Sequence, residues 1–487
     1  MPELNHNCGL FAVYDLAGGR MLMPNVVHGI RELGHRGQQS AGIARAKDDT
    51  RRRTLDVIAG PGQAQRVFPE PQGLFLDPSR AAVGHTRYST SPGECYQPLL
   101  DPQRKIAVAF NGTLANFSDL KLPEEITDTQ LLLRVALEEI SADVHQRCTA
   151  ATFLRMEELF DGAFNVAILQ AADKGHLASL DAYRDASGKH PLLYSVVDDL
   201  MVVASEDWPI RQMWEGAYIK DVPPGGHIHA EGNQWSLREL IKDPKLSHCF
   251  FEWVYFAFVE SKLDGESVRN FRHRTGKLMA QIDPEFVEKS FDHIVFPVPE
   301  SAKAGGNAYA QTLGLRTNYR GIERNPQHRG REFMLEQKEA KHLVHPEQFR
   351  GKVAIIWEDS IVRARTLMRL LQDVRAAQPR EIHVRLGCPP IFGICPYGID
   401  IQTIKELFAP AFTNGQPLHG DTLGPEILEA MAQRLEVTSI KFLPKGAVSQ
   451  ALNKPSKHLC MACVDGKYPT PKGRELYQQL REQYINP

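Results

Sequence analysis

The chain has 487 residues, too many for a single hydrophobic core, so its length predicts two to four domains. Its 42% hydrophobic and 24% charged residues are typical of a globular protein. The 57 basic residues nearly balance the 59 acidic ones, for a formal net charge of -2. This balance gives no electrostatic basis for nucleic acid or an anionic membrane surface as the main partner.

The sequence lacks the features of a membrane or secreted protein. No stretch approaches the roughly 20 apolar residues that span a bilayer, and residues 1–15 lack the basic start and apolar core of a secretory signal. We therefore expect a cytoplasmic protein with reduced thiols, in which clustered cysteines serve as metal ligands or catalysts rather than as disulfides. The eight cysteines are Cys8, Cys95, Cys148, Cys249, Cys388, Cys395, Cys460 and Cys463.

The first half of the chain reads as short β-strands and amphipathic helices separated by glycine-rich turns. Residues 128–140 have helical apolar spacing, which predicts a helix capped by Asp128. The turn-rich run 221–234 predicts a hairpin that closes the first domain, with a linker before Cys249.

The second half predicts a parallel sheet. Residues 293–301, 352–360 and 381–389 are near-continuous apolar runs that end in polar or turn residues, and a helix is expected over 363–377. Strands of this composition are buried on both faces by helices, and ligands bind beyond their carboxyl ends. From about Thr403 onward, we expect helices and a cysteine-containing tail.

Cys8 directly precedes an apolar run, 10–14, that predicts a buried strand. On its own, such a cysteine would be an ordinary buried thiol. Four ordered segments accompany it, and together they resemble the class II glutamine amidotransferase domain, an N-terminal-nucleophile hydrolase. These segments are 35–44 (HRGQQSAGIA), 84–90 (GHTRYST), 111–117 (NGTLANF) and 128–133 (DTQLLL).

The resemblance implies that Cys8 is the nucleophile. Its thiolate would attack the side-chain amide of glutamine, form a thioester and release ammonia. In this family the cysteine is the first residue of the mature chain and its own α-amino group serves as the base, so residues 1–7 would be a propeptide.

The resemblance also implies the binding groups of the glutaminase site. The Asn111 side chain and the Gly112 backbone N–H would form the oxyanion hole. Arg87 would bind the glutamine α-carboxylate through its planar fork, and Asp128 would bind the α-ammonium group.

Residues 352–367 (KVAIIWEDSIVRARTL) combine an apolar strand, an acidic pair and a loop that enters a helix. Glu358 and Asp359 can bind ribose hydroxyls or Mg²⁺, and the loop amides and helix N-terminus can receive a phosphate. An ordinary strand-to-helix turn with helix-capping acids would have the same composition.

The segment resembles the 5-phosphoribosyl-1-diphosphate (PRPP) loop of type I phosphoribosyltransferases. Behind a class II glutaminase domain, it indicates the amidophosphoribosyltransferase family, which makes phosphoribosylamine at the start of purine synthesis. Further segments that match are 251–268, 298–306, 328–333 (HRGREF) and 395–400. The resemblance implies Mg²⁺ ligands at Ser301, Glu358 and Asp359. It implies PRPP binding by Glu358, Asp359, Ser360, Arg363, Ala364, Arg365 and Thr366.

This loop departs from the family pattern Asp-Asp-Ser-Ile-Val-Arg-Gly-Thr-Thr. Glu358 replaces the first aspartate, Ala364 the glycine and Arg365 a small hydroxyl residue, while Trp357 stands where a smaller residue is usual. The loop 332–350 is also shorter than in the family. Two other functions therefore stay open, namely a glutaminase with a different phosphorylated acceptor and a binding protein that senses a phosphorylated ligand.

The pair Cys460 and Cys463 forms a CxxC motif, which alone would suggest structural zinc or a redox pair. The resemblance to the iron–sulfur branch of the family implies a structural [4Fe–4S] cluster, with four-cysteine zinc as the alternative. The implied ligands are Cys249, Cys395, Cys460 and Cys463, and the cysteines without such context are expected to be ordinary thiols: Cys95, Cys148 and Cys388.

The predicted architecture joins an N-terminal αββα sandwich to a parallel-sheet phosphoribosyltransferase domain. The expected small-molecule partners are glutamine and PRPP or another phosphorylated acceptor, and the resemblance implies a homo-oligomer, a tetramer or a dimer. The expected boundaries are 1–7 for the propeptide, 8–240 for the glutaminase, 249–405 for the phosphoribosyltransferase-like domain and 406–487 for a helical tail with cluster cysteines.

Overall fold

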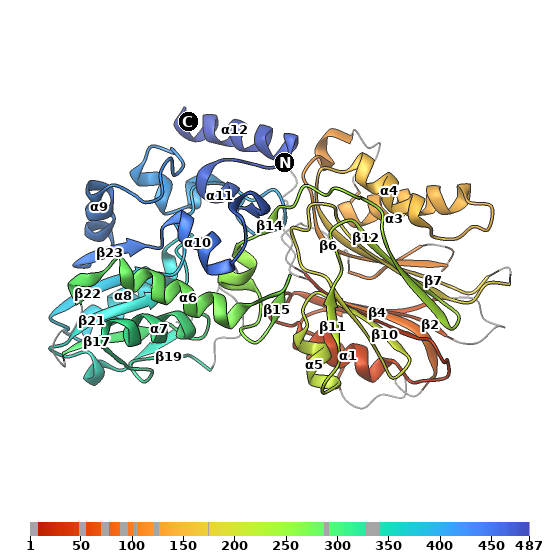
Figure 1. Ribbon diagram of the computed structural model, residues 1–487, viewed down its shortest axis with the longest axis horizontal. Coiled ribbons are helices and arrows are strands. Elements are labelled where there is room, and N and C mark those ends of the chain that lie inside the picture. Colours follow the sequence, from red (N-terminus) through yellow and green to blue (C-terminus); the bar gives the residue numbers. More distant parts are fainter. Residues whose placement is uncertain are drawn as a thin grey trace.

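The structure is a computed structural model in which two lobes lie side by side (Figure 1). No helix in the described part of the chain is long and apolar enough to cross a membrane. The expected propeptide 1–7, Cys95, the segment 328–333 and residues 332–340 of the loop 332–350 lie outside the described residues. The described residues are 8–47, 55–69, 77–87, 96–101, 103, 105–120, 126–173, 175–286, 292–326 and 341–486.

The first lobe contains two antiparallel sheets. The seven-stranded sheet has the order β11 (Ile219–Asp221), β9 (Leu193–Val197), β10 (Leu200–Ala204), β1 (Gly9–Asp15), β4 (Ser79–Arg87), β2 (Ser40–Lys47) and β3 (Leu55–Pro61). The six-stranded sheet has the order β13 (Gln234–Glu239), β12 (Gly226–Glu231), β8 (Ser179–Arg184), β7 (Gly162–Gln170), β6 (Ile106–Leu114) and β5 (Leu99–Leu100). The predicted hairpin over 221–234 is confirmed, since β12 pairs with β13.

The sheets stack because their strands carry apolar side chains on both faces. In β1, Leu10 and Ala12 face the core between the two sheets, whereas Phe11 and Val13 face the core beneath α1 (Met23–Glu32). Because both faces are buried, the strand reads as a continuous apolar run, as predicted.

Helices cover the two outer faces of the sandwich (Figure 1). Helices α1 and α5 (Trp208–Met213) lie on the seven-stranded sheet, and α3 (Asp128–Ala142) and α4 (Ala150–Leu159) lie on the six-stranded sheet. The predicted helix at 128–140 is confirmed, but its cap is Thr127, whose side chain accepts a hydrogen bond from the Gln130 N–H. Asp128 is the first helical residue, because the threonine before it forms a capping box with Gln130.

The second lobe contains the predicted parallel sheet of five strands. Each of the three predicted strands is present, and all pairings within the sheet are parallel. The helix predicted over 363–377 is α8 (Arg365–Ala376). The order is β18 (Arg316–Thr317), β17 (His293–Pro297), β21 (Val353–Glu358), β22 (Glu381–Leu386) and β23 (Ser439–Phe442).

Helices α6 (Val268–Gln281) and α7 (Lys303–Leu313) cross at two glycines. A Cβ on Gly276 would collide with the Gly305 carbonyl oxygen. Trp357, only 1% exposed, packs against Gly305, and its ring lies 5.1 Å from that of Tyr309. The unusual tryptophan is therefore a core residue beneath α7.

The segment after residue 406 is more than a helical tail. Its strand β23 pairs with β22 and forms an edge of the parallel sheet. The sequence did not predict this strand, because a run of four residues is too short to show a periodicity. Its C-terminal helix contacts the first lobe, where Lys472 Nζ donates to Asp119 at 2.8 Å. The helices of this segment are α9 (Pro425–Leu435), α10 (Lys445–Leu452), α11 (Ala462–Asp465) and α12 (Pro471–Ile485).

Candidate active site

Cys8 is fully buried and lies immediately before β1. Its backbone N–H donates a hydrogen bond to Asn111 Oδ1 at 3.2 Å. The Asn111 Nδ2 donor is buried and has no hydrogen-bond partner among the described residues. A buried amide donor without a partner costs about 1–3 kcal/mol, so its place next to the thiol suits a group that receives an oxyanion.

Gly112 follows Asn111 on β6, and a side chain cannot be accommodated there. A Cβ at this position would collide with the Ala163 carbonyl oxygen of the neighbouring strand β7. The close approach of the two strands therefore requires glycine beside Asn111.

The structure brings the expected glutamine-binding residues to the same end of the sandwich. Arg87, buried, follows Thr86, which pairs with Gly9 in the register of β4 and β1. Asp128 accepts a hydrogen bond from the Thr129 N–H at 2.8 Å. Thr129 in turn accepts a hydrogen bond from Gln97, which also binds the Phe110 N–H beside Asn111.

A buried arginine holds the carbonyl group of the expected nucleophile. Arg36 Nε donates to the Cys8 carbonyl oxygen at 3.1 Å, and Nη1 donates to Glu206 at 2.7 Å. Nη2 donates to Glu252 at 2.8 Å, and Nη1 donates to the same carboxylate at 3.1 Å. Burial disfavours the charged guanidinium, but the charges of Glu252 and Glu206 outweigh burial and raise the pKa of Arg36.

The two carboxylates connect Cys8 to the second half of the chain. Glu206 accepts from the Phe258 N–H at 2.9 Å and from the Ser261 hydroxyl at 2.7 Å. Glu252, in a π-helical turn, also binds His190 Nδ1 at 3.0 Å. His190 Nε2 lies 2.8 Å from the carbonyl oxygen of Tyr397, two residues after Cys395.

Replacing Arg36 with methionine is expected to lower the free energy of unfolding by about 3–5 kcal/mol, because it removes the main cation from two buried carboxylates. Chemical denaturation of the purified variant measures this loss. The control is Arg134→Met, which breaks an exposed pair with Glu138 and should cost no more than about 0.5 kcal/mol. Equal stability of the two variants would contradict a structural role for the buried network.

The acidic pair lies at the carboxyl end of β21, as expected. Asp359 is buried and accepts hydrogen bonds from the Ser301 hydroxyl and, at 2.9 Å, from the Ser360 hydroxyl. Glu358 Oε1 accepts from the Asp359 N–H at 3.0 Å. Carboxylate and hydroxyl oxygens converge here, and these are the ligands that Mg²⁺ prefers.

The loop from Ser360 to Ala364 leads into α8. Arg363 Nε donates to Glu406 at 2.7 Å and Nη2 donates to the Asp400 carbonyl oxygen at 2.9 Å, so this arginine ties the loop to the segment 400–406. Burial acts to raise the pKa of Glu406, but the Arg363 hydrogen bond and charge bring the pKa below its usual value. Arg365 is exposed and Thr366 is half-buried at the start of the helix.

Ala364 adopts a left-handed conformation, with φ 60°. Glycine adopts this conformation freely, whereas alanine pays about 1–2 kcal/mol for its Cβ. The departure from the family pattern therefore keeps the backbone shape of the glycine and stores strain in the loop.

The substitution Ala364→Gly is expected to raise the free energy of unfolding by about 0.5–1 kcal/mol, because it relieves this strain while giving the unfolded chain more freedom. The matched control is Ala376→Gly at the end of α8, an exposed helical position where glycine costs about 1 kcal/mol. Thermal unfolding of both variants gives the comparison, and opposite signs are expected. A loss of stability in both would contradict strain at Ala364.

A cleft of about 580 Å³ lies between the two halves of the chain. Its lining includes His35, next to the arginine that binds Cys8, and Ser301, one of the expected Mg²⁺ ligands, so the cavity lies between the two expected centres. His35 lines the cleft and also contacts Glu206 of the buried network at 2.7 Å. The basic lining residues, which suit a phosphorylated ligand, are Arg31, Arg269, Arg272, Lys303, Arg324 and Lys341.

The four expected cluster cysteines line one cavity. Cys249 and Cys460 lie opposite each other in the short parallel pair β14 (His248–Cys249) and β24 (Leu459–Cys460). Cys463 lies in α11, and its carbonyl oxygen accepts hydrogen bonds from the N–H groups of Phe392 and Gly393. Three segments that are distant in the sequence, around residues 249, 392–395 and 460–463, thus meet at this cavity.

The four thiols affect one another's ionisation. Burial and then the neighbouring Cys460 raise the pKa of Cys395 to about 12. Burial and then Cys395 and Cys460 raise the pKa of Cys249 well above its usual value. Such a group of thiols becomes anionic only when a metal supplies positive charge, so the donor set fits a thiolate-bound metal centre.

The spacing of the sulfur atoms is too wide for one ion. No three of the four sulfur atoms, all of which belong to described residues, lie within 4.8 Å of one another. Tetrahedral zinc with bonds of about 2.3 Å holds its sulfur atoms about 3.8 Å apart. A four-iron cluster is larger and holds four thiolates at greater separation.

The sequence analysis did not assign the residues of the buried network. Arg36 lies within the segment 35–44 and Glu252 within 251–268. Both segments support the family resemblance, but the sequence analysis gave neither residue a function. A charged residue inside an otherwise apolar run is the signal that would have found Glu252 in FFEWVYF, whereas Arg36 lies in a polar, glycine-rich run without such a signal. The other two expected thiols, Cys148 and Cys388, are buried outside the cavity of the four.

Comparisons with known proteins agree with this division of the chain. A family model described as a glutamine amidotransferase domain matches residues 85–212. The amidophosphoribosyltransferase of Archaeoglobus fulgidus is 30% identical over 489 residues, covering 95% of this chain and 98% of the relative. That of Methanocaldococcus jannaschii is 29% identical, with 95% and 98% covered. The solved glutamine phosphoribosylpyrophosphate amidotransferase from B. subtilis, complexed with ADP and GMP, superposes with a TM-score of 0.79, at 26% identity and with 97% of this chain and 99% of that chain covered.

The sandwich with Cys8 at its edge, fused to a parallel sheet with an acidic pair at its carboxyl end, defines a glutamine amidotransferase of the N-terminal-nucleophile class joined to a phosphoribosyltransferase domain. The extent of the match to the curated relatives then settles the family. The chain belongs to the amidophosphoribosyltransferase family.

Proposed function

We propose that this chain takes ammonia from glutamine at Cys8 and uses it to convert PRPP into 5-phosphoribosylamine. The observation that carries the proposal is the single cleft lined by residues of both halves. Ammonia would be lost to water if the two centres opened separately to solvent. A shared cleft supports transfer from one centre to the other.

In the glutaminase half, the Cys8 sulfur attacks the side-chain carbonyl carbon of glutamine. Removal of residues 1–7 would turn the Cys8 nitrogen, which lies 3.2 Å from Asn111 Oδ1, into an α-amino group that takes the thiol proton. The Asn111 Nδ2 and the Gly112 N–H stabilise the oxyanion, ammonia leaves, and water hydrolyses the thioester to glutamate. Arg87 and Asp128 bind the α-carboxylate and the α-ammonium group of the substrate.

In the acceptor half, ammonia attacks C1 of the ribose, the bond to the pyrophosphate oxygen breaks, and pyrophosphate leaves. Asp359 and Glu358 bind the ribose hydroxyls, and the backbone of 360–366 binds the 5-phosphate at the start of α8. Ser301, Glu358 and Asp359 would hold Mg²⁺, which offsets the charge of the pyrophosphate. The expected domains, 8–240 and 249–405, each contain one of these centres.

We assign the four cysteines to a structural [4Fe–4S] cluster. Its support is the shared cavity of Cys249, Cys395, Cys460 and Cys463 and the wide spacing of their sulfur atoms. The cluster would fasten the segment that contains β24 and α11 to the linker that contains β14. Burial raises the pKa of Cys460, and the charge of Lys189, which lines the same cavity, opposes part of this rise and would offset part of the negative charge of the thiolates.

The proposal includes a reducing cytoplasmic setting and a homo-oligomer, either a tetramer or a dimer. The seven described cysteines are all unbridged, which supports a reducing compartment. Light scattering of the anaerobically purified protein would determine the number of chains.

The test is glutamate release from glutamine by anaerobically purified protein, with Mg²⁺ and with or without PRPP. Strong stimulation by PRPP, with pyrophosphate formed in step with glutamate, is the expected result. Glutaminase activity that is indifferent to PRPP would support the second candidate, a different phosphorylated acceptor, which the alanine at φ 60° and the neighbouring Arg365 favour.

Replacing Asp359 with asparagine is expected to lower PRPP-dependent synthesis on the order of 10²-fold, because it removes one of the charges that would hold Mg²⁺. The measurement is pyrophosphate release at several Mg²⁺ concentrations. Asp373→Asn, an exposed change on α8, serves as the control and should have no effect. An unchanged dependence on Mg²⁺ in Asp359→Asn would remove this residue from the ligand set.

A further inference from the structure

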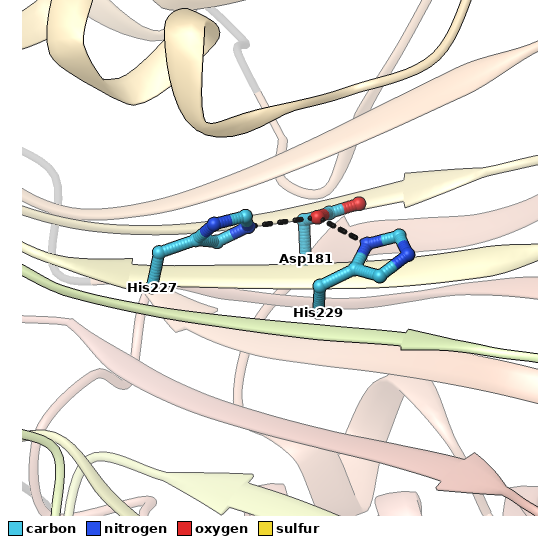
Figure 2. Close-up of side chains that lie close together, drawn as sticks. All are labelled: Asp181, His227 and His229. Carbon is cyan, nitrogen blue, oxygen red and sulfur yellow. Dashed lines mark hydrogen bonds and ion pairs between the residues drawn. The ribbon is translucent and has the colours of Figure 1, made fainter. Parts of the chain in front are cut away.

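A cluster of titratable side chains lies on the six-stranded sheet, away from both expected centres. Asp181 on β8 pairs in register with His229 on β12, and His227 lies two residues earlier on the same strand and therefore on the same face. Figure 2 shows the carboxylate between the two imidazole rings. Asp181 Oδ1 lies 2.9 Å from His227 Nε2 and 2.8 Å from His229 Nδ1.

This cluster is separate from the glutaminase site. Leu180 and Ala182 face the core between the two sheets, so Asp181 between them faces the opposite side, beneath α4. Asn111 on β6 alternates with Phe110, which faces the helices, so Asn111 points toward the other sheet. The two groups of residues therefore occupy opposite faces of one sheet.

We propose that Asp181, His227 and His229 form a binding site for a divalent transition-metal ion, with Zn²⁺ as the best fit. The three potential ligand atoms all lie within 4.8 Å of one another, and no other such group occurs among the described residues. Two imidazoles and one carboxylate suit Zn²⁺ and exclude Mg²⁺ and Ca²⁺, which take oxygen ligands.

The hydrogen bonds of the cluster aim the three potential ligand atoms at one point. Asp181 is fully buried, and its Oδ1 atom is the shared hydrogen-bond partner of His227 Nε2 and His229 Nδ1. The Nδ1 atom of His227 is buried and has no hydrogen-bond partner among the described residues. A proton on Nδ1 there would be a buried donor without an acceptor, so the hydrogen-bond geometry favours the tautomer with the proton on Nε2, facing Asp181.

Protein side chains cover the site at His227, and solvent reaches it at His229. The Phe153 ring of α4 packs 4.6 Å from that of His227 and shields it from water. The His229 side chain is 32% exposed, so an ion can enter and keep water as its fourth ligand. Its far nitrogen, Nε2, lies 3.8 Å from the Glu231 carboxylate, the kind of outer partner that orients histidine ligands.

The geometry also limits the affinity. Tetrahedral zinc bonds of about 2.0–2.1 Å set ligand atoms about 3.3 Å apart, so the half-exposed His229 must move outward by about 0.5 Å. Metal binding at His227 Nε2 shifts the proton of that nitrogen to Nδ1. Because Nδ1 lacks an acceptor, this shift weakens metal binding about tenfold. The site is thus a reversible one that fastens β8 to β12, in contrast to the four-cysteine cavity.

The test uses the full-length protein with its iron loaded, stripped of loosely bound metal by a chelator and kept in saturating Mg²⁺ so that oxygen sites are filled. Co²⁺ is the probe, followed by its visible absorption and by metal analysis after desalting. One equivalent of Co²⁺ per chain is expected to bind, and Zn²⁺ is expected to displace it. The midpoint of thermal unfolding should rise with the bound ion.

Two variants and one control make the test specific. Asp181→Asn and His229→Gln keep side-chain hydrogen bonding and should each weaken Co²⁺ binding by at least about a hundredfold. If the buried change at Asp181 impairs folding, Co²⁺ binding by the half-exposed His229→Gln variant still tests the proposed site. The control is His383→Gln, a strand histidine with one carboxylate partner, Glu381, and no third ligand. It should bind Co²⁺ as the parent protein does.

Two results would overturn the proposal. Equal Co²⁺ binding by the parent and by His229→Gln would place the ion elsewhere, as an adventitious ion only. Absence of saturable binding below millimolar Co²⁺ would leave Asp181, His227 and His229 as a hydrogen-bonded ion pair without a metal.

Discussion

Replacing Cys8 with alanine is expected to abolish glutamine-dependent synthesis, with a loss on the order of 10⁴-fold or more, while synthesis from free ammonia continues. The variant lacks the sulfur that forms the thioester, so no ammonia is released from glutamine. The acceptor centre at the end of β21 is untouched, because Asp359 and Ser301 lie in the other half of the chain. Pyrophosphate release from PRPP, with glutamine or with an ammonium salt as the nitrogen source, measures both activities.

The matched control for this experiment is Cys148→Ala. Cys148 is a second buried thiol of the same half, and burial raises its pKa well above the usual value, so it is protonated and unreactive. This variant should keep both activities. Loss of ammonia-dependent synthesis in Cys8→Ala would contradict two separable centres, and retained glutamine-dependent synthesis would remove Cys8 as the nucleophile.

The strands of this protein could be predicted from its sequence because burial leaves a local signal. Residues 10–14 and 353–357 are apolar without interruption because each strand is covered on both faces, and the structure has β1 and β21 there. Cys8 stood out for a similar reason, because its position before a buried strand and its companion motifs all lie in the linear sequence. The short β23 left no such signal.

The partners of Arg36 could not be predicted, since they depend on how distant segments meet. Glu206 and Glu252 lie 170 and 216 residues further along the chain, and neither has a spacing that points to Arg36. The paired histidines at 227 and 229 are visible as an alternating pattern in a predicted hairpin. Their carboxylate, Asp181, lies 46 residues before His227, and only the pairing of β12 with β8 reveals it.

The buried network gives a physical route between the two halves. Arg36 binds the carbonyl oxygen of Cys8 and shares two carboxylates with the second half, where Glu252 continues through His190 to Tyr397. Tyr397 follows Cys395 by two residues, so the network ends at the cavity of the four cysteines. A change at that cavity can therefore reach the expected nucleophile through a short series of buried hydrogen bonds.

Replacing Cys460 with serine is expected to release iron and to lower the stability of the protein by several kcal/mol, because it removes one of the four thiolates that would hold the cluster. The change should also loosen the C-terminal segment. Cys460 lies opposite Cys249 in the β14–β24 pair, and α12 after it contacts the first lobe through Lys472 and Asp119. Iron analysis, the visible absorption of the anaerobic protein and limited proteolysis of residues beyond 456 measure the three effects.

The control is Cys388→Ser. Cys388 is fully buried but lies outside the lining of the four-cysteine cavity, and its sulfur already donates to the Pro389 carbonyl oxygen at 3.1 Å, a bond that a hydroxyl can replace. This variant should keep its iron. If Cys460→Ser instead keeps full iron content and colour, Cys460 is not a ligand. If it loses iron but binds one equivalent of zinc in the same cavity with unchanged stability, the cavity holds a single ion through its three remaining thiolates. Sulfur atoms around zinc lie about 3.8 Å apart, so these three, which do not all lie within 4.8 Å of one another, would have to move closer by about 1 Å.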